Sequence, residues 1–202
     1  MRSVELLEQL QADVRQLILT ASHLEKEGRH FLTLQPGAGK WSVAQVLEHL
    51  SSYGYYYLPQ IEKSLSGSSS SVAEWFRPGW LGNYFTKIMR PGKNGKIANK
   101  MKAPKDHTPV LTLDIKTVLN TFMEQQHRLL NLLEEAKGKD IGSARTPISI
   151  SRFIKLKTGD TFRFLIAHEQ RHFVQINNTL ELVKGSEVLQ TAGDRPLVMK
   201  AV

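Results

Sequence analysis

The chain has 202 residues of a composition usual for a globular protein, enough for one buried core, and we expect a single domain over residues 1–202. Because cysteine is absent, disulfides, thiolate metal ligands and a cysteine nucleophile are excluded. The net charge of +8 is confined to residues 75–105, since the rest of the chain is neutral, which excludes a global adaptation to polyanions.

The N-terminal part of the chain predicts two long helices. Residues 1–6 lack the apolar stretch of a signal peptide, and no run of about 18 apolar residues predicts a membrane span. The absence of cysteine fits a cytoplasmic protein, which we expect. Apolar residues at helical spacing predict a first helix over residues 4–31, followed by a loop at 36–39. A second helix is expected from Ser42 to Leu65, because Ser42 and Gln45 have the spacing of a capping box.

The next segment, residues 75–105, is basic and aromatic and contains no acidic residue. Its basic residues are Arg77, Lys87, Arg90, Lys93, Lys96, Lys100, Lys102 and Lys105, and its aromatic residues are Trp75, Phe76, Trp80, Tyr84 and Phe85. Such a mixture can stack on single-stranded nucleic acid or lie at an anionic membrane surface. We favour another interpretation, in which the aromatic residues pack over the open end of a helical bundle and the lysines form a solvated loop. A cationic rim for a carboxylate-bearing substrate is a further option.

Two more helices are predicted in the C-terminal half. The third begins at Asp114, a suitable N-cap, and runs to about Gly138. The fourth runs from Asp160 to Lys184, with Gly185 placed to end it, and residues 148–151 predict a short extended piece before it. Four amphipathic helices predict an all-α four-helix bundle, with the basic segment as a long crossover loop between helices two and three.

The last predicted helix contains the sequence HEQRH at residues 168–172. Histidines four residues apart lie on one helix face, so both imidazoles can bind one divalent ion. The same letters match the H-E-x-x-H signature of zinc proteases, in which Glu169 would be the general base. That alternative needs a third ligand downstream, such as Glu181 or Glu187, and usually a sheet edge that holds the peptide; no convincing sheet precedes the motif.

A third ligand can also come from another helix. Of the other histidines, we expect His30 and His107 to be solvated, and His23 and His127 to be ordinary surface or pocket residues. His49 differs, because it lies two turns after the capped start of the second helix, among core residues. We therefore favour a site in which one divalent metal ion binds the histidine triad, defined as His49, His168 and His172. Three imidazoles leave a coordination position open, as in catalytic sites, and suit zinc, nickel or iron.

The segments around the triad resemble the DinB-like superfamily of metal-binding bundles. WSVAQVLEHL at residues 41–50 is similar to the opening of the family's second helix, AHEQRHFVQI at 167–176 to its last-helix motif, and KMKAPK at 100–105 to its connecting loop. The resemblance covers nearly the whole chain in the right order and spacing. It implies an up-down-down-up four-helix bundle, a metal site formed by the histidine triad, and a homodimer.

The resemblance also implies a chemistry. Characterised members use low-molecular-weight thiols (bacillithiol, mycothiol or glutathione) in transfer or isomerisation, which implies a divalent metal, zinc or nickel, a thiol cofactor and a small-molecule substrate. Glu169 then becomes a bystander near Arg171 or solvent, and the metallohydrolase interpretation is disfavoured, as is nucleic-acid binding. Gln175 and Tyr53, close to the triad, are candidates for orienting a ligand. Many members carry an acidic residue one turn after the first histidine, where this chain has residues 51–53, Ser-Ser-Tyr.

Overall fold

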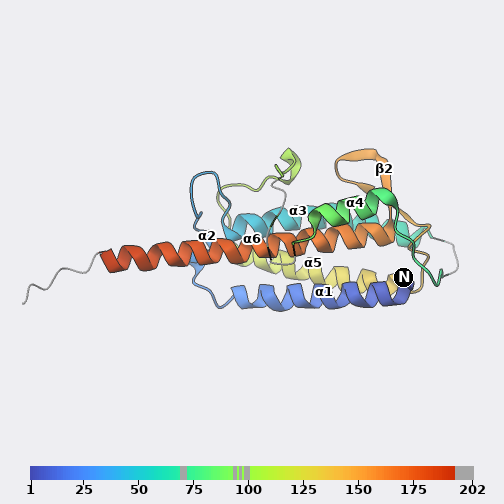
Figure 1. The fold of residues 1–202 in the computed structure, drawn as a ribbon, viewed down its shortest axis with the longest axis horizontal. Coiled ribbons are helices and arrows are strands. Elements are labelled where there is room, and N and C mark those ends of the chain that lie inside the picture. Colours follow the sequence, from blue (N-terminus) through green and yellow to red (C-terminus); the bar gives the residue numbers. More distant parts are fainter. Residues whose placement is uncertain (69–71, 93–94, 96, 98–100, 194–202) are drawn as a thin grey trace, which may run out of the picture.

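A computed structural model describes residues 1–68, 72–92, 95, 97 and 101–193; Lys93, Lys96 and Lys100 of the basic segment lie outside these ranges. Four long helices lie side by side (Figure 1): α1 (Ser3–Leu24), α3 (Val43–Ser66), α5 (Ile115–Ala136) and α6 (Thr158–Gly193). α1 and α6 run in one direction and α3 and α5 in the other (Figure 1). The predicted all-α bundle with up-down-down-up order is therefore confirmed.

The hydrophobic core fills the space among these four helices. α3 packs against α5 and α6, and α1 packs against the same two helices. Each helix contributes side chains that are fully buried, among them Val14, Leu47, Phe122 and Phe162. Burial of one apolar stripe per helix is the main stabilising contribution expected for such a bundle.

The predicted starts of α3 and α5 are confirmed in atomic detail. The Ser42 hydroxyl accepts from the backbone N–H of Gln45, and the Gln45 side chain accepts from the backbone N–H of Ser42, which completes the capping box. The carboxylate of Asp114 accepts from the backbone N–H of Thr117 at the start of α5. Because α3 begins at a fixed residue, His49 lies at a defined height and face in the bundle.

Two predicted helix ends are wrong. The first helix ends at Leu24, and after a turn the separate short helix α2 (Arg29–Thr33) follows, so the predicted span 4–31 is interrupted before Gly28. The last helix does not end at Gly185 but continues to Gly193. Gly185 does not have the positive φ that a glycine C-cap requires, so it is an interior helix residue.

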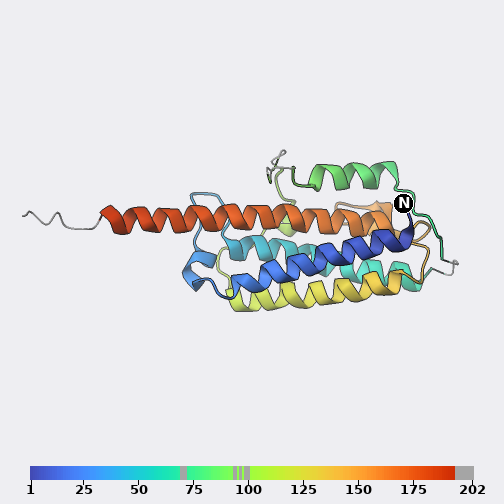
Figure 2. The same cartoon turned by 60° about the horizontal axis from the view of Figure 1, so that its bottom comes forward.

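The basic aromatic segment contains a helix where a loop was predicted. α4 (Trp80–Met89) lies along α6 on the outside of the bundle (Figure 2). Of the five aromatic residues expected to pack over the bundle, two pack against it: Phe76 is fully buried, and Phe85 contacts the core. Trp75, Trp80 and Tyr84 are exposed, so the prediction that all these aromatic residues cover the bundle end is wrong.

A β-hairpin precedes α6 and is longer than the predicted piece at 148–151. Strand β1 (Arg145–Ile148) pairs antiparallel with β2 (Ser151–Lys157). Four hydrogen bonds between described residues attach the hairpin to α3, one of them from the Thr146 hydroxyl to the Ser64 hydroxyl (3.2 Å). The Tyr56 hydroxyl donates to the Ile148 carbonyl (3.0 Å), the Ser149 N–H donates to the Tyr57 hydroxyl (3.2 Å), and the Ser64 hydroxyl donates to the Arg145 carbonyl (2.8 Å).

None of the helices in the described residues is long and apolar enough to cross a membrane.

Candidate metal centre

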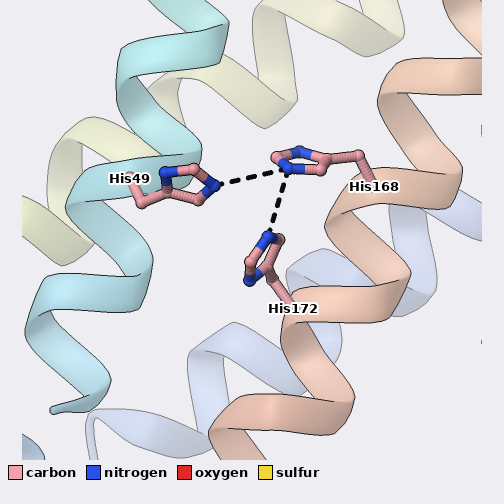
Figure 3. Close-up of side chains that lie close together, drawn as sticks. All are labelled: His49, His168 and His172. Carbon is pink, nitrogen blue, oxygen red and sulfur yellow. Dashed lines mark hydrogen bonds between the residues drawn. The ribbon is translucent and has the colours of Figure 1, made fainter. Parts of the chain in front are cut away.

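The structure brings the three histidines of the predicted triad together in the interior of the bundle. His49 projects from α3, and His168 and His172 project from successive turns of α6 towards it (Figure 3). Nε2 of His168 lies 3.4 Å from Nε2 of His49 and 3.1 Å from Nε2 of His172. The ligand nitrogens of all three lie within 4.8 Å of one another.

These separations fit a divalent ion. With metal–nitrogen bonds of about 2.0–2.1 Å, two ligands of a tetrahedral centre stand roughly 3.3 Å apart. The two Nε2–Nε2 distances, 3.4 and 3.1 Å, are close to that value. Imidazole nitrogen is also a ligand that zinc, nickel and iron accept readily. These two separations and the ligand type therefore both fit a metal ion held by the three histidines.

The outer ring nitrogens of two histidines are held by hydrogen bonds. Nδ1 of His49 lies 2.6 Å from the main-chain carbonyl oxygen of His107, and Nδ1 of His172 lies 2.9 Å from Oε1 of Gln175. Because both partners are acceptors, each Nδ1 carries the proton, and the lone pair of each ring is at Nε2, which faces the other histidines. Nδ1 of His168 is buried and has no hydrogen-bond partner among the described residues.

Burial keeps the imidazoles uncharged. Desolvation lowers the pKa of His49 to about 4 and that of His172 to about 3. Burial also lowers the pKa of His168 well below its ordinary value, and the neighbouring His172 and His49 lower it further. Neutral imidazoles have a free lone pair, so the triad is in the protonation state that a metal ion requires.

His107, which we expected to be solvated, is buried beside the triad. It lies in the 3₁₀ helix η1 (Lys105–His107), and its ring stacks on Tyr53 with a centroid distance of 3.9 Å. Tyr53 in turn contacts His168, with ring centroids 4.4 Å apart. Ser52 lies 2.9 Å from Nδ1 of His107 and donates to the His49 carbonyl. The 3₁₀ helix η1, at the end of the crossover, thus packs on α3, which local sequence patterns did not indicate.

Glu169 is also placed differently from the prediction. It is buried and not solvated, and its Oε1 accepts from Nε2 of Gln126 on α5 at 2.9 Å. Burial raises the pKa of the Glu169 carboxyl to about 7. Because its hydrogen bond is to α5 while the triad lies between α3 and α6, Glu169 does not have the position of the general base in an H-E-x-x-H protease.

Arg171 is a further buried charged residue near the triad that sequence reasoning did not single out. It is 6% exposed, and its positive charge contributes to the lowered pKa of His168 and His172. The remaining histidines, His23, His30 and His127, are exposed, and His30 lies 3.4 Å from Glu187. They take no part in the triad.

The bundle and its triad define an α-helical protein with a potential metal site between its second and last long helices. A family model of the DinB superfamily matches residues 6–176, which include the triad, so the chain belongs to the DinB superfamily. Among solved structures it is similar to one described as "YfiT from Bacillus subtilis is a probable metal-dependent hydrolase with an unusual four-helix bundle topology". The identity is 17%, the TM-score is 0.47, and the match covers 92% of this chain and 86% of that chain. No curated protein matches the chain.

Proposed function

We propose that this member of the DinB superfamily is a metal-dependent enzyme that transfers a low-molecular-weight thiol to a small electrophilic substrate. In this proposal His49, His168 and His172 bind one divalent ion, zinc or nickel. The observation that supports it best is the convergence of three neutral imidazoles, with Nε2 of His168 at 3.4 Å and 3.1 Å from the other two. A homodimer in the cytoplasm, as the family resemblance implies, is part of the same proposal.

The residues of the site have separate tasks in this proposal. The triad holds the ion, while His107 and Gln175 hold two of the imidazoles in one tautomer and one ring orientation. A bound ion with an open coordination position supplies Lewis acidity that favours ionisation of an incoming thiol. The chain contains no cysteine, so the sulfur nucleophile has to come from the cosubstrate.

The proposed transfer is a substitution and needs neither an oxidant nor a reductant. The sulfur of the thiol forms a bond to the electrophilic carbon of the substrate, and the leaving group departs with the electrons of the bond that breaks. The thiol proton passes to solvent. With an aryl halide as the electrophile, the products are a thioether, a halide ion and a proton.

Metal content tests the site. We expect protein purified without an affinity tag to contain one divalent ion per chain by mass spectrometry, and the His168→Ala and His172→Ala variants to lose it. His127→Ala is the matched control, because His127 is exposed and lies on α5, away from the triad. Full metal content in both triad variants would contradict the site.

Thiol transfer is tested with the metal-loaded protein. Glutathione, bacillithiol and mycothiol are each offered with 1-chloro-2,4-dinitrobenzene, and formation of the thioether is followed by absorbance. We expect catalysis with at least one thiol, and its loss in His168→Ala. Protein that retains its metal but accelerates none of the three reactions would contradict thiol transfer and leave a hydrolytic reaction as the alternative.

A Glu169→Gln variant separates the proposal from protease-type chemistry. Glutamine preserves an acceptor oxygen for Gln126 and removes only the ionisable group, so we expect metal content and thiol transfer to be retained. Loss of activity with normal metal content would assign Glu169 a catalytic role. A general base typically contributes about 10²–10⁴-fold, so the two outcomes are easily distinguished.

A further inference from the structure

A groove lies outside the triad, between the C-terminal half of α3, the β-hairpin and η1. Its volume is about 980 Å³, within the range of small-molecule sites. α3 contributes Tyr56 and Lys63, the hairpin contributes Arg145 and Lys155, and η1 contributes His107. Three segments far apart in the sequence thus form its walls.

The charges that line the groove are mainly positive. Lys63, Arg145 and Lys155 come from α3, β1 and β2, and Asp106 is the acidic residue among the described lining residues. Within the ranges that the structure describes, no salt bridge neutralises any of the three cations. The carbonyl end of α3 adds only about half a negative charge. Three full positive charges therefore exceed the negative charge facing them.

Hydrogen bonds attach the hairpin wall of the groove to the α3 wall. Tyr56 and Ser64 attach the hairpin to α3 by donating to the Ile148 and Arg145 carbonyls. Nη1 of Arg145 donates to the carbonyls of Gly142 and Ser143, both at 2.7 Å, which fixes its guanidinium group without neutralising it. A cation fixed before binding loses less conformational entropy when an anion binds to it.

We propose that this groove is a binding site for a small-molecule anion that carries carboxylate or phosphate groups. Both groups are matched by guanidinium and ammonium donors through charge-assisted hydrogen bonds. The inference goes beyond the proposed function, because binding at Lys63, Arg145 and Lys155 requires no metal ion.

The groove is nevertheless in contact with the metal centre through one residue. His107 lines the groove, its ring stacks on Tyr53, and its carbonyl accepts from Nδ1 of His49. A ligand in the groove that contacts His107 is therefore separated from the triad histidine His49 by this single residue.

Binding is tested on metal-free protein labelled with ¹⁵N. Inorganic phosphate and succinate are titrated separately, and the amide shifts are followed by NMR; the two arms distinguish phosphate from carboxylate recognition. We expect saturable shifts of groove residues with at least one probe, with a Kd of about 1 mM or tighter. The double variant Lys63→Gln/Lys155→Gln is expected to bind at least about tenfold more weakly. Arg145 is left unchanged because it also holds the turn before β1.

The matched control is Lys26→Gln/Lys116→Gln, which removes the same charge from two exposed residues outside the groove. We expect it to bind like the wild type, and His168→Ala to do the same, which separates this inference from the metal site. No saturable shift with either probe would overturn the proposal. Equal weakening in the control and groove variants would also overturn it, since binding would then reflect net charge alone.

Discussion

Gln175 and His107 hold two of the three triad imidazoles by hydrogen bonds to their Nδ1 atoms, at 2.9 Å and 2.6 Å. The Gln175 contact follows from the sequence, because residues three apart on a helix are neighbours. The His107 contact does not, because the burial of a loop residue depends on tertiary packing. The hydrogen bond of Glu169 could not be predicted for the same reason, because its partner, Gln126, lies 43 residues away in the sequence.

The contact of Gln175 predicts that two substitutions at this position differ in their effect on metal affinity. Gln175→Ala removes the acceptor of the His172 Nδ1–H and is expected to weaken metal affinity by about 10–100-fold. Gln175→Glu keeps an acceptor oxygen and is expected to retain affinity within a few-fold. Competition against a metal chelator measures both. Equal affinity of the alanine variant and the wild type would show that Gln175 does not orient His172.

At the scale of elements, the long amphipathic helices could be predicted and the short elements could not. The capping residues Ser42 and Asp114 determine two helix starts, and the histidine spacing in α6 determines one face. α4 was not predicted because its ten residues are too few to show a clear helical period. Gly82 also weakens the helical pattern of this segment, although the helix continues through it. Gly185 was misinterpreted because a glycine marks a helix end only where the chain adopts a positive φ.

Two glycines in helices are expected to respond oppositely to alanine. At Gly82 a Cβ atom would lie 2.4 Å from Cβ and Cγ of the buried Asp160, so Gly82→Ala forces α4 away from α6 and is expected to cost about 1–3 kcal/mol. At Gly185, apart from the residue's own helix backbone and chain neighbours, no atom of the described residues lies within 4 Å of the added Cβ, so Gly185→Ala is expected to stabilise by about 0.5–1 kcal/mol. Urea unfolding measures both free energies. Destabilisation by Gly185→Ala would contradict a continuous α6.

At the scale of the whole molecule, the bundle connects regions distant in sequence at one site. His49 and His168 are 119 residues apart, yet both project into the same layer between α3 and α6. The helix order and the ligand-type residues were sufficient to predict this meeting. The groove could not be predicted, since Lys63 and Lys155 become neighbours of one cavity only when the hairpin folds onto α3.

Because the triad joins α3 to α6, metal removal is expected to destabilise the whole bundle. Free metal at 100 times its Kd stabilises the folded state by about 2.7 kcal/mol, so chelation is expected to lower the Tm by several degrees. Calorimetry with and without EDTA measures the shift, which should vanish in His172→Ala and persist in His127→Ala. An EDTA effect of equal size in His172→Ala would mean that the stabilising ion binds elsewhere.

The acceptor for Nδ1 of His49 is a main-chain carbonyl, and every amino acid at position 107 supplies one. Substitution of His107 therefore leaves this acceptor chemically intact, while a deletion of one residue in the preceding connection would displace it by up to about 3.5 Å. Among related sequences, the length of the segment before position 107 is accordingly a better guide to a correctly oriented first ligand than the identity of the residue there.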